Sequence, residues 1–426
     1  MKKEKIKKFI YPNKLKLVFI PSPEETFTLL ILVNVGSEYE DKKTNGISHF
    51  LEHLCFKGTE KRPSSKEISL EFDSLGAYVN AFTSYEYTGY FAKARKVHFK
   101  KILELLSDIY LQPIFPEKEI EKERGVILEE LRTYHDLPSS YVKEIFLNLL
   151  YPDQPAGWPI VGSEENIKKF KQKDFFSFRK KHYLPSKTVV ALCGDFNFEE
   201  IKKEIGESFS SLFFKKPPLK KKVKTTFAFR KKVCFREIKQ IHLNLGVPIF
   251  SIFNEKKYPL KVANAILSYG MSSRFWEKLR EKLAAVYSFS SEVNLFSDHG
   301  YFLFRSSTNQ EQLAKVILTV CQEWQKIKKE IVEKSELRKA KETLKSSLSF
   351  SLETTEDKAF FYGLNELILK ETPTPKEIFQ KIEKVKEEEI QKVAEEIFNK
   401  EKINIALLGP IKKFPEKIEK EIKRIL

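Results

Sequence analysis

Residues 46–59 have the sequence Gly-Ile-Ser-His-Phe-Leu-Glu-His-Leu-Cys-Phe-Lys-Gly-Thr, in which His49, Glu52 and His53 carry potential chemistry. On a helix that turns by about 100° per residue, Glu52 and His53 lie within about 60° of His49, so the three side chains share one face. Two imidazoles four residues apart can take adjacent positions on a tetrahedral zinc ion, which leaves room for a third protein ligand and a water. A carboxylate beside them can hold that water and accept its proton. The segment therefore predicts a hydrolytic zinc centre, with the order of the His-Glu-x-x-His motif inverted.

The alternative for so short a motif is a pair of surface histidines beside a glutamate. Leu51, Leu54 and Phe56 surround the polar residues, which predicts a half-buried helix. Polar groups on such a helix need partners, because burying them unpaired is costly. Cys55 lies about 200° from His53 around the helix, so we exclude it as a ligand.

A third ligand is expected from the helix predicted over residues 116–135. With Glu123 placed at 0°, Glu130 falls at about −20° and Glu129 at about −120°. Glu123 and Glu130 therefore lie within the apolar stripe of this helix, and Glu129 lies outside it. The stripe comprises Ile120, Val126, Ile127 and Leu131. A carboxylate pair facing the protein interior is explained if one member binds a cation and the other supports the site from behind. The geometry selects Glu130 over Glu129 as the third ligand.

The chain of 426 residues is long enough for two to three domains. Residues 213–226 contain two prolines and six lysines, which predicts an interdomain linker at the midpoint of the chain. We therefore predict a zinc-bearing domain over residues 1–212 and a homologous second domain over residues 227–426.

Apolar runs and turn residues predict a similar order of elements in the two halves. In the first half we expect strands over 15–20, 27–35, 78–83, 87–94 and 188–193, and helices over 45–56, 68–75, 99–110 and 116–135. In the second half we expect strands over 242–247, 286–293 and 301–306, and helices over 258–267 and 270–283. This pattern predicts an α+β fold made by duplication of one unit. Only the first copy has the metal motif.

Four segments resemble the family of pitrilysin, insulin-degrading enzyme and mitochondrial processing peptidase. Residues 46–59 are similar to its zinc-motif segment, and residues 123–130, Glu-Arg-Gly-Val-Ile-Leu-Glu-Glu, to its second zinc element, which again selects Glu130. Residues 80–83, Asn-Ala-Phe-Thr, resemble the strand that binds peptide beside the cleft. Residues 270–287 resemble the segment with the distal arginine and tyrosine. Departures are mild: Lys14 stands where glycine is usual and Ser48 where alanine is usual.

The resemblance implies two similar α/β-sandwich domains that enclose a chamber, and a zinc endopeptidase (Zn²⁺ cofactor) acting on unfolded peptides or flexible segments. Glu52 would be the general base on the zinc-bound water. The residues that it assigns are His49, His53 and Glu130 as ligands, Asn80, Ala81 and Phe82 for substrate binding, and Arg280 and Tyr287 at the substrate backbone. Glu123 is the supporting carboxylate that the helix geometry indicates. Because the zinc motif and the Arg/Tyr pair occur in one chain, a self-sufficient homodimer is expected. Without the resemblance, Arg280 would be a surface ion-pair residue, Tyr287 a core aromatic and Asn80 a turn residue.

The formal net charge of +17 raises the possibility of a nucleic-acid, membrane or acidic partner. Many lysines stand among glutamates, as on solvated helix faces, so we predict no specific nucleic-acid partner. The competing hypothesis is a basic binding protein that contacts nucleic acid through residues 215–224, but such a protein has no need of Glu52. Four scattered cysteines fit a reducing compartment. With no signal-peptide core or transmembrane segment in the sequence, we expect a cytoplasmic protein.

Overall fold

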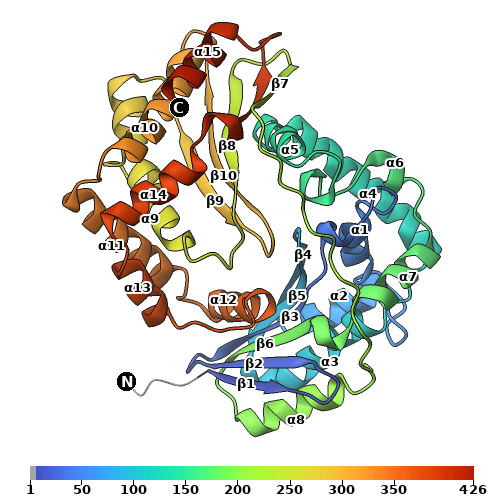
Figure 1. The fold of residues 1–426 in the computed structure, drawn as a ribbon. Helices are drawn as coiled ribbons and strands as arrows, with labels where there is room; N and C mark the ends of the chain where they lie inside the picture. Colours follow the sequence, from blue (N-terminus) through green and yellow to red (C-terminus); the bar gives the residue numbers. More distant parts are fainter. Residues whose placement is uncertain (1–5) are drawn as a thin grey trace. The chain divides into compact units, whose positions relative to one another are not determined.

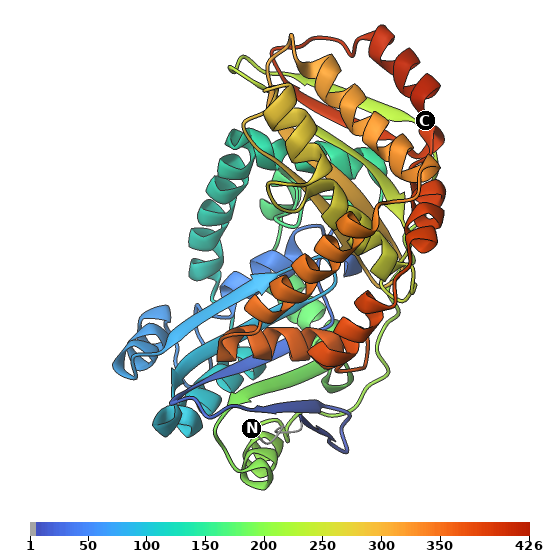
Figure 2. The same cartoon turned by 90° about the vertical axis from the view of Figure 1, so that its left-hand side faces the viewer.

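The computed structural model describes residues 6–426 (Figures 1 and 2), which form two compact units of mixed α/β structure. Unit 1 contains the chain up to Arg132 together with Trp158–Lys221 and Phe350–Pro373. Unit 2 contains Thr133–Gly157, Lys222–Ser349 and Thr374–Leu426. The predicted fold of two mixed α/β domains is confirmed. The predicted linker over 213–226 includes the junction between the units, and residues 213–229 have neither helix nor strand in the structure.

Unit 1 is built on a six-stranded sheet in the order β1-β2-β6-β3-β5-β4. Its strands are β1 (Lys7–Ile10), β2 (Lys16–Pro21), β3 (Thr26–Val33), β4 (Tyr78–Thr83), β5 (Thr88–Arg95) and β6 (Thr188–Gly194). β2 and β6 pair in parallel, and the other neighbours are antiparallel. β4 is therefore an edge strand.

Unit 2 is built on a five-stranded sheet in the order β7-β11-β8-β10-β9. Its strands are β7 (Arg230–Phe235), β8 (Ile241–Ile249), β9 (Phe289–Leu295), β10 (Gly300–Thr308) and β11 (Asn404–Gly409). β7 and β11 pair in parallel, and the other neighbours are antiparallel. The order and direction match those of β2-β6-β3-β5-β4, as a duplication of one unit predicts.

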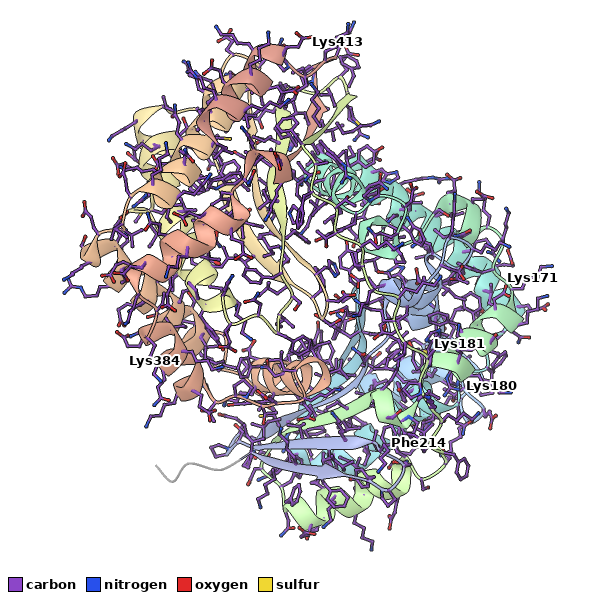
Figure 3. The ribbon with its side chains drawn as sticks, in the orientation of Figure 1. Lys171, Lys180, Lys181, Phe214, Lys384 and Lys413 are labelled. Atoms are coloured by element: carbon purple, nitrogen blue, oxygen red, sulfur yellow. The ribbon has the colours of Figure 1, made fainter. Side chains whose placement is uncertain are left out.

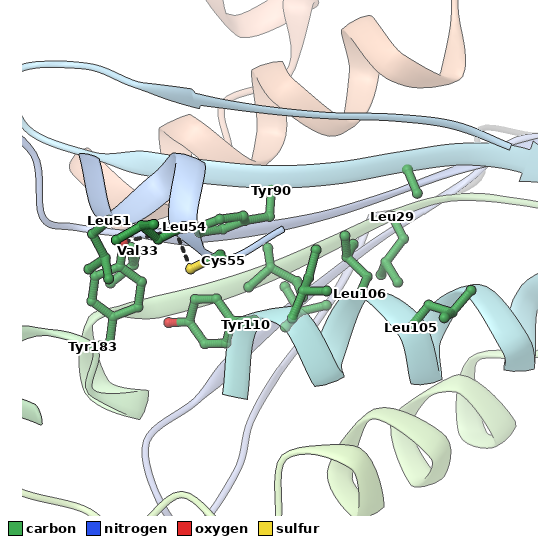
Figure 4. Close-up of a cluster of buried hydrophobic side chains, with 14 of the residues drawn as sticks. Leu29, Val33, Leu51, Leu54, Cys55, Tyr90, Leu105, Leu106, Tyr110 and Tyr183 are labelled. Atoms are coloured by element: carbon green, nitrogen blue, oxygen red, sulfur yellow. Dashed lines mark hydrogen bonds between the residues drawn. The ribbon is translucent and has the colours of Figure 1, made fainter. Parts of the chain in front are cut away.

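The central strands of unit 1 are apolar on both faces because helices cover both. Leu29, Ile31 and Val33 of β3 face the larger core, which Leu105 and Leu106 of α3 complete (Figure 4). The helices of unit 1 are α1 (Ile47–Leu54), α2 (Ser65–Ser74), α3 (Phe99–Leu111), α6 (Glu164–Ile167), α7 (Gln172–His182) and α8 (Phe198–Ser208), with most of α4 (Glu117–Asp136). A strand buried on both faces is a continuous apolar run without alternation, as the sequence of β3 shows.

The opposite face of the unit 1 sheet is covered by α12 (Thr355–Ile368), a helix from the second half of the sequence. Ala359 and Tyr362 of α12 pack in one cluster with Leu30 and Leu32 of β3. A Cβ atom at Gly363 would lie 3.0 Å from side-chain carbons of Leu32 and β6, so glycine permits this close approach. Figure 1 shows α12 lying across β3 and β6.

Unit 2 has the reciprocal arrangement. α5 (Pro138–Leu150), a helix from the first half of the sequence, packs against β7, β8 and β11. A Cβ atom at Gly246 of β8 would lie 2.8 Å from the ring of Phe146 of α5. The other helices of unit 2 are α9 (Lys257–Ser268), α10 (Leu313–Lys329), α11 (Lys334–Phe350, ending in unit 1), α13 (Pro375–Glu383), α14 (Glu387–Ile397) and α15 (Glu416–Ile425). Each sheet is thus covered on one face by a helix from the other half of the sequence.

Candidate metal centre

The helix α1 that carries the histidines begins at Gly46, whose φ of 100° places it in the left-handed region. A Cβ atom there would lie 2.8 Å from Gly162 Cα, so only glycine fits. The buried carboxylate of Glu40 accepts hydrogen bonds from the backbone N–H groups of Gly46 and Ser48, each at 2.8 Å, and from Asn45 Nδ2 at 3.1 Å. Glu40 thereby satisfies N–H groups at the start of α1 that have no partner within the helix. It fixes the start of the helix that carries the metal motif.

His49, His53 and Glu130 come together as the sequence predicted. The two imidazole centroids are 4.6 Å apart, and Glu130 Oε1 lies 3.6 Å from His49 Nε2 while Glu130 Oε2 lies 3.7 Å from His53 Nε2. One ligand atom from each residue lies within 4.8 Å of the others. Ligands at zinc–nitrogen and zinc–oxygen distances of about 2.1 Å in a tetrahedron are about 3.4 Å apart. Two imidazoles and a carboxylate at these separations fit a zinc ion.

Glu123 supports this cluster from behind. Its carboxylate, which is buried, lies 2.9 Å from His53 Nδ1 and accepts a hydrogen bond from Lys57 Nζ at 2.7 Å. Burial alone would raise the pKa of Glu123, but its bonds to His53 and Lys57 outweigh burial and lower it. A carboxylate on Nδ1 fixes the tautomer that leaves Nε2 free to bind a metal.

Glu52 lies beside the three candidate ligands but is not one of the group. Its side chain is buried and accepts a hydrogen bond from Thr83 Oγ1 at 2.7 Å. Burial raises the pKa of Glu52, while the neighbouring His49 and the bond from Thr83 oppose that rise. A carboxylate with a raised pKa beside a metal site is suited to exchange protons. Sequence reasoning did not identify Thr83 as a partner of Glu52.

The helix α4 presents a narrower buried face than predicted. Ile120, Ile127 and Leu131 are buried, but Val126 is 52% exposed, so its inclusion in the apolar stripe was wrong. The buried apolar side chains lie between about 40° and 80° from Glu123, whereas Val126 lies at about −60°. Glu130, at the margin of this face, remains 29% exposed at its side chain. Glu129 pairs with Arg132 at the surface and is not part of the cluster with the histidines.

The predicted substrate-binding residues lie on β4, the edge strand that ends at Thr83. Asn80 is exposed, and Ala81 is half-buried. The ring of Phe82 packs against Phe360 of α12, with centroids 5.2 Å apart, and so turns toward the face of the sheet that α12 covers. Among residues 6–426, no strand pairs with the outer edge of β4.

Arg280 and Tyr287 lie together in unit 2. Arg280 belongs to a π-helical segment, η5 (Trp276–Lys282), and its guanidinium donates a hydrogen bond to the backbone carbonyl of Tyr287. The same guanidinium lies 4.7 Å from the ring centroid of Trp276 and 5.1 Å from that of Tyr287. Tyr287 is 80% exposed, so it is not a core aromatic. The structure thus brings these two residues together.

Comparison with known proteins relates both halves of the chain to one family. Residues 17–164 match the model of the insulinase family (peptidase family M16), and residues 169–344 match the model of the M16 inactive domain. The uncharacterized zinc protease YmxG of Bacillus subtilis is 32% identical over 411 residues, which cover 96% of this chain and all of that protein. The chain belongs to the M16 peptidase family. An uncharacterized zinc protease of Rickettsia bellii is also 32% identical, over 89% of this chain and 91% of its own.

Solved M16 structures share the fold. A protease from Helicobacter pylori superposes with a TM-score of 0.89 at 25% identity, over 95% of this chain and 99% of its own. An M16 inactive domain from Pseudomonas fluorescens gives 0.88 at 18% identity, over 96% and 100%. Within the described part of this M16 chain, no helix is long and apolar enough to cross a bilayer.

Proposed function

We propose that this M16 protein is a zinc endopeptidase in which His49, His53 and Glu130 hold the metal and Glu52 is the general base. The observation that carries the proposal is the set of three ligand atoms within 4.8 Å of one another, beside the buried carboxylate of Glu52. Zinc peptidase activity is supported by the family and by relatives named zinc proteases.

When bound, zinc supplies Lewis-acid polarisation of the scissile carbonyl and acidifies the attacking water. Glu52 accepts the proton of that water and returns it to the leaving amine. The hydrogen bond from Thr83 holds one oxygen of Glu52, so that the other is available to the water. Glu123 keeps the ring of His53 in the orientation that binds metal.

We propose that the substrate is an extended peptide that pairs with the open edge of β4, where Asn80 and Ala81 lie. Pairing of this kind reads the peptide backbone more than its sequence. Because β4 ends at Thr83, which contacts Glu52, a peptide added along this strand leads to the metal centre. A folded protein does not present a free strand, so unfolded peptides and flexible segments enclosed in a chamber are the expected substrates.

Arg280 and Tyr287 are assigned to the substrate backbone by the family resemblance, in a self-sufficient homodimer. Their mutual contact and the exposure of Tyr287 support this assignment. We expect Arg280→Ala and Tyr287→Phe to leave zinc content and melting temperature close to wild type while lowering kcat/KM strongly. Loss of zinc or of stability in these variants would contradict the assignment.

The decisive experiment uses Glu52→Gln. We expect this variant to retain stoichiometric zinc and to lose about 10²–10⁴-fold in cleavage of a quenched peptide, as removal of a general base predicts. Glu129→Gln, which removes a carboxylate at the surface, is the matched control and should keep full activity. Wild-type activity should disappear with a chelator and return with zinc. Near-wild-type turnover by Glu52→Gln would refute the role of this residue.

A further inference from the structure

Residues 213–219 of unit 1, Phe-Phe-Lys-Lys-Pro-Pro-Leu, form a surface loop that the peptidase function does not use. Phe213 is 78% exposed, Phe214 55% and Leu219 93%, and Figure 3 shows Phe214 at the surface. Lys215 and Lys216 between them are also exposed. Three large apolar side chains at these exposures within seven residues are unusual for a surface that faces only water.

The loop is held at both ends. Before it, Asn13 Nδ2 donates hydrogen bonds to the carbonyls of Phe209 and Leu212 at 3.3 and 3.0 Å. After it, Lys220 Nζ forms ion pairs with the buried carboxylates of Glu38 and Glu86 at 2.5 and 2.7 Å. Pro217 and Pro218 restrict the backbone between these anchors. The exposed side chains are therefore presented by a loop of limited freedom.

The surrounding sequence is strongly basic. Residues 208–236 contain ten lysines and arginines and no aspartate or glutamate. The next longest stretch without an aspartate or glutamate, residues 256–276, is shorter, so residues 208–236 are the longest acid-free segment of the chain. An acid-free basic segment complements a surface that carries many negative charges.

We propose that the loop 213–219 docks this protein on an anionic lipid bilayer. The rings of Phe213 and Phe214 and the side chain of Leu219 would enter the boundary between headgroups and acyl chains, and the lysines would contact lipid phosphates. Apolar side chains interleaved with lysines bind such an interface by burial and charge together. Bases of a single strand could stack on Phe213 and Phe214, but Leu219, the most exposed residue of the loop, has no ring. A bilayer accounts for all three apolar side chains, so single-stranded nucleic acid fits the loop less well.

The test measures binding of the full-length protein to vesicles of phosphatidylcholine with and without about one third phosphatidylglycerol. We expect binding only to the anionic vesicles, weakened by salt. Each lysine near the surface contributes about fivefold in partitioning, so Lys215→Ala with Lys216→Ala should weaken binding by about 25-fold. Phe213→Ser with Phe214→Ser should weaken it by more than about tenfold, since apolar burial is lost.

The matched control is Lys180→Ala with Lys181→Ala, which removes the same charge from the exposed end of α7 (Figure 3). It should leave vesicle binding within about twofold of wild type if the loop, and not net charge, is responsible. A tryptophan reports on depth: the emission of Leu219→Trp should be quenched by brominated lipid. Leu70→Trp, at an exposed position of α2, should not be quenched.

Three outcomes would overturn the proposal. The first is absence of binding to anionic vesicles, and the second is equal loss of binding in the loop variant and in the α7 control. The third is a loop variant that loses binding to a single-stranded oligonucleotide but keeps binding to vesicles. Because none of the substituted residues is among the candidate ligands or their partners, peptide cleavage in solution should remain at the wild-type rate in every variant, which shows that each is folded.

Discussion

Replacing Glu123 with glutamine tests whether the buried carboxylate behind His53 controls metal affinity. Glutamine has nearly the same shape, so the substitution removes charge without creating a cavity. The wild-type carboxylate lies 2.9 Å from His53 Nδ1 and 2.7 Å from Lys57 Nζ. The variant amide can still accept one hydrogen bond, but its NH₂ group would face another donor.

The size of the effect follows from these contacts. A hydrogen bond to a charged group contributes about 1.5–3 kcal/mol and a neutral one about 1 kcal/mol. The change at His53 therefore makes zinc binding less favourable by about 0.5–2 kcal/mol. Loss of the negative charge near a dication weakens zinc binding further. We expect the zinc dissociation constant to rise about 10–100-fold, the range found when a group that supports a metal ligand is removed.

The assay is competition for zinc between the protein and a chromophoric chelator, with all variants measured at one pH. Glu129→Gln, on the same helix but paired with Arg132 at the surface, is the control and should change affinity less than about twofold. The melting temperature of the metal-free proteins separates a loss of metal affinity from a loss of folding. Unchanged affinity in Glu123→Gln, or an equal change in both variants, would refute the reasoning.

Three further predictions address the ligand, the core and the response to acid. Glu130→Gln should retain little zinc after dialysis, because one of the three proposed ligands loses its charge. Metal analysis measures the zinc that remains. Gly363→Val should lower the free energy of unfolding by about 1–3 kcal/mol in denaturant titrations, since the added atoms meet Ala191, 3.0 Å from a Cβ at this position. Burial would raise the pKa of Glu104, but bonds from Arg62 and Lys101 outweigh burial and lower it from 4.5 to about 2. A carboxyl with a lowered folded-state pKa contributes stability above pH 4.5 that is lost as the pH falls toward 2. The difference in free energy of unfolding between wild type and Arg62→Met should therefore become smaller over that interval. A difference that grows as the pH falls would contradict this.

Much of the arrangement of the candidate site was predictable because it depends on local helix geometry. His49, Glu52 and His53 lie on one helix, and their spacing fixes which face they share. Glu130 was separated from Glu129 by the same reasoning on a second helix. The error at Val126 has a related cause: periodicity gives the direction of a buried face, but its width depends on what packs against it.

The supporting residues could not be predicted in this way. Glu40 and Thr83 reach α1 from a loop and a strand, through contacts that no spacing rule describes. β11 is a run of six buried residues among charged helices, and so short an apolar run does not distinguish a strand from part of a helix. The sequence likewise contains no local signal that assigns α5 and α12 to the sheet of the opposite half, because an amphipathic helix fits either sheet equally well by pattern.

The exchange of these helices has a consequence for synthesis of the chain on the ribosome. The sheet of unit 1 has all its strands once Gly194 has been made, but α12, which covers its second face, ends 174 residues later at Ile368. At about 5–20 residues per second, the ribosome needs about 9–35 s to synthesise the chain from Gly194 to the end of α12. During this time Leu30 and Leu32, both fully buried in the finished protein, lie on an apolar surface open to other nascent chains and to chaperones. A chain that ends before α12 would keep this apolar surface exposed. The last quarter of the chain, which contains α12, therefore protects the solubility of the sheet in unit 1.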